Sequence, residues 1–186
     1  MISSPERDLL PLDRVAPSAA PLAWRTNAGL FMATVASVFV TWLLHEAPSR
    51  AGAFHALQYT AALMAILLAH EFGHFIAARI HRVDASLPYF IPLPIISWFG
   101  TMGAVIRMRS VIPTRRALLD IGAAGPLAGM AVAIPLYAWG VAHSQLVATD
   151  GSNGDMVELG GSLLLRLLDR CFGPTVPDGM DVLLSP

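Results

Sequence analysis

The stretch "ALMAILLAHEFGHFIAARI", residues 62–80, decides the fold. It is apolar enough for a helix that crosses a lipid bilayer, which takes about 20 residues. Yet it carries His70, Glu71 and His74 within five positions. An ionised side chain inside a membrane is costly unless a partner satisfies it. The stretch therefore predicts a membrane helix that contains a polar site.

The composition also indicates a membrane protein. Of the 186 residues, 55% are hydrophobic and only 13% are charged, whereas an ordinary soluble domain has about 25% charged residues. The formal net charge of −1 gives no basis for nucleic acid as a partner. Cys171 is the single cysteine, so an intrachain disulfide is excluded.

Three runs are long and apolar enough to cross a bilayer, namely residues 28–44, 57–80 and 117–142. Each could instead be a buried helix of a soluble protein, but so few charges argue against that. We therefore predict an α-helical polytopic membrane protein with about three transmembrane helices. The lipid bilayer would be one partner of such a protein. The sequence does not predict its oligomeric state.

Basic residues predict the orientation. The connection between the second and third runs is rich in arginine and has Asp84 as its one acid; the arginines are Arg79, Arg82, Arg107, Arg109, Arg115 and Arg116. Because basic residues gather on the cytoplasmic side, residues 81–116 and a flexible N-terminal tail, 1–26, are placed in the cytoplasm. The segment from 144 then lies outside. We expect an integral multi-pass protein of a bacterial cell inner membrane.

The 81–116 connection is too rich in proline for a continuous helix. Residues 104–109 alternate in polarity, which indicates a strand, and Gly100 and Gly103 supply a bend before it. We predict a β-hairpin that is partly embedded in the membrane beside the ionisable cluster. The alternative is a cytoplasmic loop that rests on the lipid headgroups.

"HEFGH" has the pattern H-E-x-x-H, which suits a metal site on a helix. Positions i and i+4 share a face, so His70 and His74 can present two imidazoles to one ion. Glu71 lies about 100° further round the helix, where it can take a proton from a water molecule that zinc activates. The alternative is a buried His/Glu hydrogen-bond network that joins helices.

The third apolar run contains "GAAGPLAG", which predicts close helix packing. Gly122, Gly125 and Gly129 have the spacing of small residues at a contact between membrane helices. Pro126 removes a backbone hydrogen bond and is expected to kink the helix. Asp120 is most simply explained by a pair with Arg116 at the i,i+4 spacing.

Taken together, these features resemble the site-2 protease family of intramembrane zinc metalloproteases. The resemblance rests on "HEFGH", on the Pro-rich "PYFIPLPIISWFGTMGAVIRMRS" and on "AAGPLAG", and it covers about residues 55–142. It implies that His70 and His74 bind zinc (Zn2+) and that Glu71 is the catalytic carboxylate. It also implies that the hairpin pairs with an extended substrate, a transmembrane segment of another protein.

One part of the family pattern is absent from the sequence. The family takes its third zinc ligand from a Leu-Asp-Gly aspartate that follows Asn-x-x-Pro in a later helix, and no such pattern occurs here. Asp150 and Asp178 precede glycines in stretches that read as turns outside the membrane. We therefore expect residues 27–143 to form a partial metalloprotease core. Residues 144–186 would be an extracytoplasmic tail or loop leading to a missing helix, as in a truncated chain.

Two other functions remain open at this stage. A non-catalytic membrane protein that binds helices, a pseudoprotease, would hold its partner at the same site without cleaving it. A metal transporter would need polar residues along more than one span, whereas only residues 57–80 carry such a cluster. The sequence therefore favours an intramembrane metalloendopeptidase.

Overall fold

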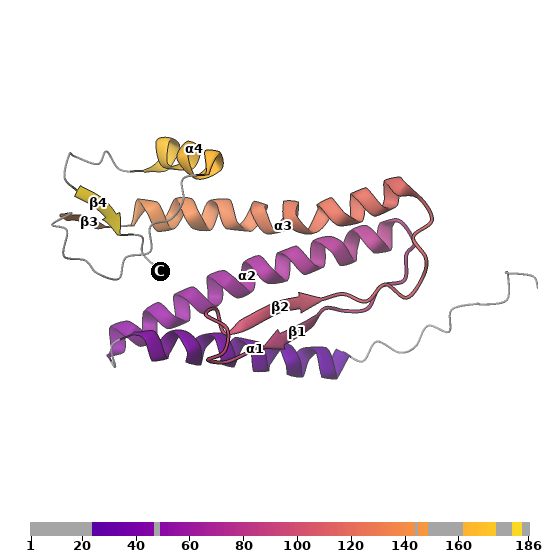
Figure 1. Cartoon of the computed structure of the whole chain (residues 1–186), viewed down its shortest axis with the longest axis horizontal. Helices are drawn as coiled ribbons and strands as arrows, with labels where there is room; N and C mark the ends of the chain where they lie inside the picture. Colours follow the sequence, from indigo (N-terminus) through magenta and orange to yellow (C-terminus); the bar gives the residue numbers. More distant parts are fainter. Residues whose placement is uncertain (1–23, 47–48, 144, 149–161, 174–179, 184–186) are drawn as a thin grey trace, which may run out of the picture.

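The computed structural model describes residues 24–46, 49–143, 145–148, 162–173 and 180–183. Figure 1 shows four helices and two small antiparallel sheets in these parts of the chain. The helices are α1 (Trp24–His45), α2 (Arg50–Ile80), α3 (Arg115–Ala142) and α4 (Leu163–Phe172). The strands are β1 (Tyr89–Pro92), β2 (Thr101–Val105), β3 (Gln145–Ala148) and β4 (Met180–Leu183).

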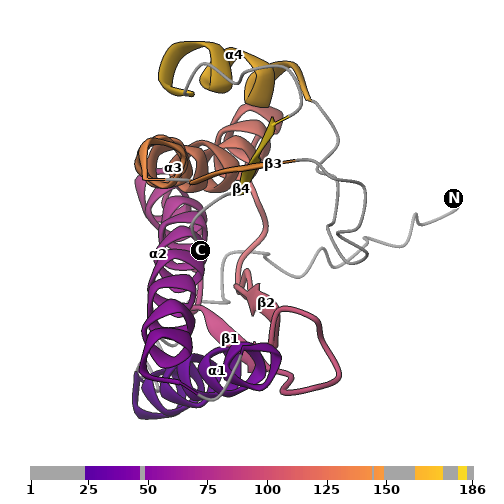
Figure 2. The same cartoon turned by 90° about the vertical axis from the view of Figure 1, so that its left-hand side faces the viewer.

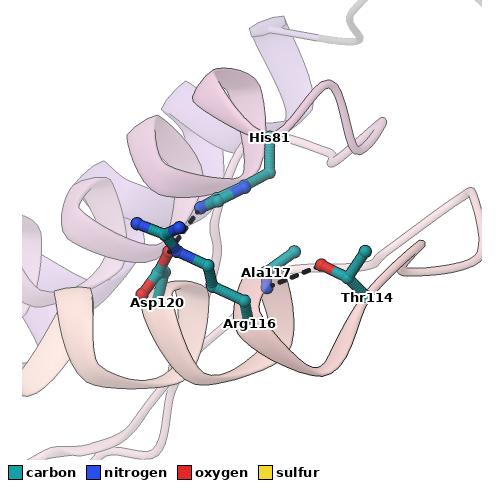
Figure 3. Close-up of polar contacts among 5 residues, drawn as sticks. All are labelled: His81, Thr114, Arg116, Ala117 and Asp120. Carbon is teal, nitrogen blue, oxygen red and sulfur yellow. Dashed lines mark hydrogen bonds and ion pairs between the residues drawn. The ribbon is translucent and has the colours of Figure 1, made fainter.

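The three predicted apolar runs are confirmed as helices, and each is long and apolar enough to cross a membrane. They comprise 22, 31 and 28 residues, so all three exceed their predicted ranges, α3 by only its first two residues. Helix α2 starts early because Ser49 caps it, its hydroxyl accepting from the N–H of Gly52 at 3.0 Å. Thr114 caps α3 in the same way, accepting from the N–H of Ala117 at 3.1 Å (Figure 3).

The predicted β-hairpin is present between α2 and α3. Strands β1 and β2 pair antiparallel, and the register shifts between Phe90 and Pro92. Gly100 and Gly103 form the bend, with φ angles of +75° and +94°. Residues with a side chain rarely adopt such positive φ angles.

The predicted strand limits were wrong, since β2 ends at Val105 rather than at residue 109. Beyond Val105, extended pairing resumes against residues just after α2. Ser86 N–H donates to the Arg107 carbonyl at 2.9 Å, and Arg109 N–H donates to the Asp84 carbonyl at 2.7 Å. The alternation from 104 to 109 therefore reflects real extended backbone, which is divided between the hairpin and its stem.

The long helices form a single layer in the order α1, α2, α3, and the hairpin lies on one side of it, next to α1 (Figure 2). The core is small. One buried cluster joins Val38 of α1, Met64 of α2 and Phe90 of β1. Large apolar side chains face outward instead, such as Leu44 (66% exposed) and Leu127 (62% exposed). This distribution is expected of helices whose solvent is lipid.

The C-terminal segment is more structured than predicted. It contains a short amphipathic helix, α4, capped by Ser162, whose hydroxyl accepts from Leu165 N–H at 3.2 Å. Strands β3 and β4 pair antiparallel from Gln145↔Leu183 to Ala148↔Met180 and were not foreseen. Residues 180–183, which lie in the segment predicted to be a tail or loop, thus belong to a strand. The proposed division at residues 26 and 143 stays a prediction.

Candidate metal centre

His70 and His74 lie between α2 and α3, next to Gly129 and Gly125 of α3, and their rings point to one position. Their Nε2 atoms lie 3.1 Å apart, and their rings meet at an interplanar angle of 78°. This is the i,i+4 geometry that the sequence predicted for a helix. Two imidazole nitrogens are thus presented to a single position.

That spacing suits zinc. With Zn–N bonds of roughly 2.0–2.1 Å and tetrahedral angles, two ligand nitrogens lie about 3.3–3.4 Å apart. The Nε2 atoms are at 3.1 Å, so a shift of a few tenths of an ångström would open them to that distance. These two residues therefore fit the metal that the motif predicts, as two of its ligands.

The His74 ring is oriented from α3. Its Nδ1 lies 2.7 Å from the carbonyl oxygen of Ile121, which can only accept a hydrogen bond. Nδ1 of His74 therefore carries the proton, and in the neutral ring the lone pair is on Nε2. A carbonyl behind the second ring nitrogen is the usual way in which proteins fix a histidine ligand.

Glycines in α3 make room for both rings. A Cβ atom on Gly125 would lie within 2.1 Å of His74 Nε2, and one on Gly129 would lie 3.4 Å from His70 Nδ1. The third predicted glycine, Gly122, is different, since a Cβ there meets nothing within 4 Å. The prediction of a three-glycine contact was therefore wrong at Gly122, because that position faces away from α2.

Close approach of the two helices depends on α2 as well. A Cβ on Gly73 would lie 2.4 Å from the Ala124 carbonyl oxygen and 2.8 Å from the Cβ of Ala128. The glycine between the two histidines thus lets α3 come near enough to hold their rings. This is the small-residue packing typical of membrane helices.

Glu71 points into the protein. Its side chain is only 7% exposed, whereas Phe72 and Ile76 on the outer side of α2 are 38% and 53% exposed. On a helical wheel Glu71 lies roughly 60° from His74, beside the position on which the imidazoles converge. A carboxylate is therefore held next to the candidate metal position.

A third ligand is not found in the described part of the chain. Among these residues no group of three or more His, Cys, Asp or Glu side chains could hold a metal ion. Asp150 and Asp178, the two candidates considered from the sequence, lie outside the described residues. The expected incompleteness of the chain stays a prediction.

Asp120 is engaged elsewhere, at the end of α2 (Figure 3). Its Oδ2 lies 2.9 Å from Nε2 of His81 and 3.8 Å from Nε of Arg116. The predicted Asp120–Arg116 pair is confirmed. The closer contact with His81 was not predicted, because the two residues are far apart in the chain.

A helix with the H-E-x-x-H pattern that packs against a glycine-rich helix is the arrangement expected of a membrane metallopeptidase. Comparison with known proteins agrees with this class. Residues 58–178 match the family model described as Peptidase family M50. The chain belongs to this family, which is the site-2 protease family that the sequence resembles. No solved structure matches it.

Plant proteins are among its relatives. The chain is 39% identical over 120 residues to "Probable zinc metalloprotease EGY1, chloroplastic" of Arabidopsis thaliana. This alignment covers 62% of this chain and 21% of that protein. It is 38% identical over 120 residues to the Oryza sativa subsp. japonica protein of the same name, covering 62% of this chain and 20% of that protein. To "Probable zinc metalloprotease EGY2, chloroplastic" of Arabidopsis thaliana it is 30% identical over 126 residues, covering 65% and 21%.

The chain thus spans about a fifth of the length of these relatives. Their names place them in chloroplasts, so they do not support the predicted bacterial inner membrane. The three apolar helices support a membrane protein without identifying the membrane.

Proposed function

We propose that this chain carries the catalytic centre of an intramembrane zinc metalloendopeptidase, which cleaves transmembrane segments of other proteins. The observation that carries the proposal is the convergence of His70 and His74 Nε2 atoms, 3.1 Å apart, within a helix of membrane length and apolarity. Membership in Peptidase family M50 and the names of the relatives support it.

His70 and His74 would hold the zinc ion, and the carbonyl of Ile121 would keep His74 in the tautomer that ligation requires. When bound, zinc supplies Lewis acidity that polarises the substrate carbonyl and lowers the pKa of water. A third protein ligand is needed, because catalytic zinc sites normally have three.

Glu71 would act as general base and then as general acid. Its carboxylate accepts a proton from the attacking water as the oxygen bonds to the scissile carbonyl carbon. It then returns that proton to the amide nitrogen as the C–N bond breaks, so the products are a carboxylic acid and an amine. The burial of Glu71 favours this role, since bulk water is kept from the carboxylate.

The hairpin would hold the substrate. Strand β1 is covered by α1, whereas within the described residues β2 has neither a further strand nor extensive helix contact on its other edge. A substrate in extended form can therefore add to β2 through backbone hydrogen bonds. An unwound transmembrane segment needs such partners, because lipid supplies none for its N–H and C=O groups.

Proteoliposomes with a fluorescent transmembrane reporter test the proposal. We expect about one zinc per chain by elemental analysis, and loss of the metal in His70→Ala and His74→Ala. Glu71→Gln should retain zinc and lose cleavage by a factor of at least about 10². Wild-type cleavage rates in Glu71→Gln would refute the role of Glu71.

A second candidate function is helix binding without hydrolysis. It is favoured by the lack of a third ligand among the described residues. Tight binding of the reporter by zinc-supplied wild-type protein, with no cleavage product, would establish this pseudoprotease and exclude the peptidase.

A further inference from the structure

One face of α1 is polar although the helix as a whole is apolar. Asn27, Thr34 and Thr41 recur every seven residues, which places them on one side of the helix together with Ser37. All four are buried: Asn27 is 8% exposed, Thr34 0%, Ser37 7% and Thr41 2%. Buried polar groups in such a setting require hydrogen-bond partners.

Near the N-terminal end of α1, the side chain of Asn27 is hydrogen-bonded to the stem of the hairpin. Its side-chain amide nitrogen donates to the carbonyl of Pro88 at 2.8 Å and to the carbonyl of Leu87 at 3.2 Å. These two residues lead directly into β1. The start of the hairpin is therefore fixed at the beginning of α1.

Toward the C-terminal end of α1, the side chains of Ser37 and Thr41 are hydrogen-bonded to the turn between the strands. The Ser37 hydroxyl donates to the Gly100 carbonyl, and Oγ1 of Thr41 accepts from the N–H of Ile95 at 3.3 Å. Fourteen residues separate Asn27 from Thr41, which is about 21 Å along a helix. Hydrogen bonds thus fix the hairpin at both ends over most of a bilayer's hydrocarbon thickness of about 30 Å.

The backbone of the turn is shaped to fit α1. A Cβ on Gly100 would lie 2.7 Å from the Cα of Val38, so only glycine allows this approach. Ile95 has a φ of +66°, a conformation that a β-branched residue avoids unless its surroundings impose it. Its side chain is 74% exposed, so the contact that holds Ile95 is its backbone bond to Thr41.

Thr34 provides a natural comparison on the same face. Its hydroxyl donates to the carbonyl of Leu30 at 2.8 Å, within α1 itself. Among the described residues, the side-chain hydrogen bonds that join residues 87–105 to a helix come from Asn27, Ser37 and Thr41. The hairpin is thus attached to α1, whereas the histidines and Glu71 are on α2.

We propose that Asn27, Ser37 and Thr41 are positioning residues that set the height of the hairpin along α1. This inference rests on the proposed function, in which a substrate strand pairs with β2. The height of β2 then decides which peptide bond of that strand lies opposite Glu71. Because a misplacement of about 1 Å can reduce a rate about 100-fold, these contacts govern both rate and cleavage position.

The substitution Thr41→Val tests this, with Thr34→Val as its matched control. Both replace a buried threonine on one face of α1 by an isosteric residue, but the side chain of Thr41 is hydrogen-bonded to the hairpin, whereas that of Thr34 is hydrogen-bonded within α1. With zinc-supplied protein in proteoliposomes, we expect Thr41→Val to lower kcat about ten-fold and to move part of the cleavage to a neighbouring bond. Thr34→Val should stay within about two-fold, and Thr41→Ser, which keeps the hydroxyl, should restore the wild-type pattern.

Hydrogen–deuterium exchange in detergent gives a readout that needs neither zinc nor substrate. Amides in residues 93–100 should exchange about ten-fold faster in Thr41→Val than in Thr34→Val, because Ile95 N–H loses its acceptor. Equal exchange and equal cleavage patterns in the two variants would overturn the inference. Wild-type protein that does not cleave the reporter would refute the proposed function, and the exchange experiment would still decide whether Thr41 holds the hairpin.

Discussion

The α2–α3 contact and the α1–hairpin contact bring polar groups together in different ways. Between α2 and α3, the contact depends on residues without a side chain. Gly73 allows α3 to pack closely, and Gly125 leaves space for the ring of His74. Between α1 and the hairpin, Gly100 also allows a close approach, but here Asn27 and Thr41 in addition form side-chain hydrogen bonds with backbone groups of the hairpin. In an apolar setting helices can meet backbone to backbone, whereas a short hairpin needs partners for its unpaired N–H and C=O groups.

The substitution Gly125→Ala should break the first contact with the largest effect. Its Cβ would lie 2.1 Å from His74 Nε2, so the imidazole must leave its place. We expect zinc affinity to fall about 100-fold, a loss typical of disturbed ligand orientation. Gly122→Ala, with nothing within 4 Å, is the matched control and should bind zinc like the wild type. Metal titration measures both, and equal affinities would contradict the fit between ring and glycine.

The substitution Gly73→Ala tests the helix approach itself. The added methyl group would meet the backbone oxygen of Ala124 at 2.4 Å, and a backbone cannot yield as a side chain does. Overpacking of this kind costs about 1–3 kcal/mol, which thermal unfolding in detergent would register as a lower Tm. Gly29→Ala in α1 has open space and should be neutral or stabilising by up to about 1 kcal/mol. A Gly73→Ala protein as stable as the wild type would show that the interface is not tight.

The substitution Gly100→Ala acts on the second contact. Both Gly100 and Gly103 have positive φ, so alanine carries a conformational cost of roughly 1–2 kcal/mol at either position. Only at Gly100 does the new Cβ also collide with α1, at 2.7 Å from Val38 Cα. The loss of thermal stability should therefore be larger for Gly100→Ala than for Gly103→Ala. Equal losses would mean that the turn does not touch α1.

The substitution Asp120→Asn should have the smallest effect. It removes the negative charge that faces His81 and Arg116, but Asp120 is 48% exposed and water screens such interactions. We expect a stability loss below about 1 kcal/mol that shrinks as salt is added. A larger, salt-independent loss would show that this end of α2 and α3 depends on the His81 contact more than packing does.

Local periodicity was enough to predict the long helices and the pairing of His70 with His74. It could not show which face of α3 meets α2, so Gly122 was grouped with Gly125 although only Gly125 faces a histidine. The polar face of α1 was also missed, since Asn27 and Thr41 are unremarkable until their partners, dozens of residues later, are known. Strand limits failed because Val105 and Arg107 alternate alike although only the first pairs with β1. These are long-range contacts, and one sequence carries no direct record of them.

The dependence of the hairpin on α1 has a consequence for biosynthesis. Chains emerge from the ribosome N-terminus first, so α1 and α2 are made before residues 89–105 exist. The nascent hairpin therefore meets Ser37 and Thr41 on a helix that already stands in place, and its strained Ile95 never has to form alone. Domains that lack a preceding helix of this kind would have to supply another template for the same turn.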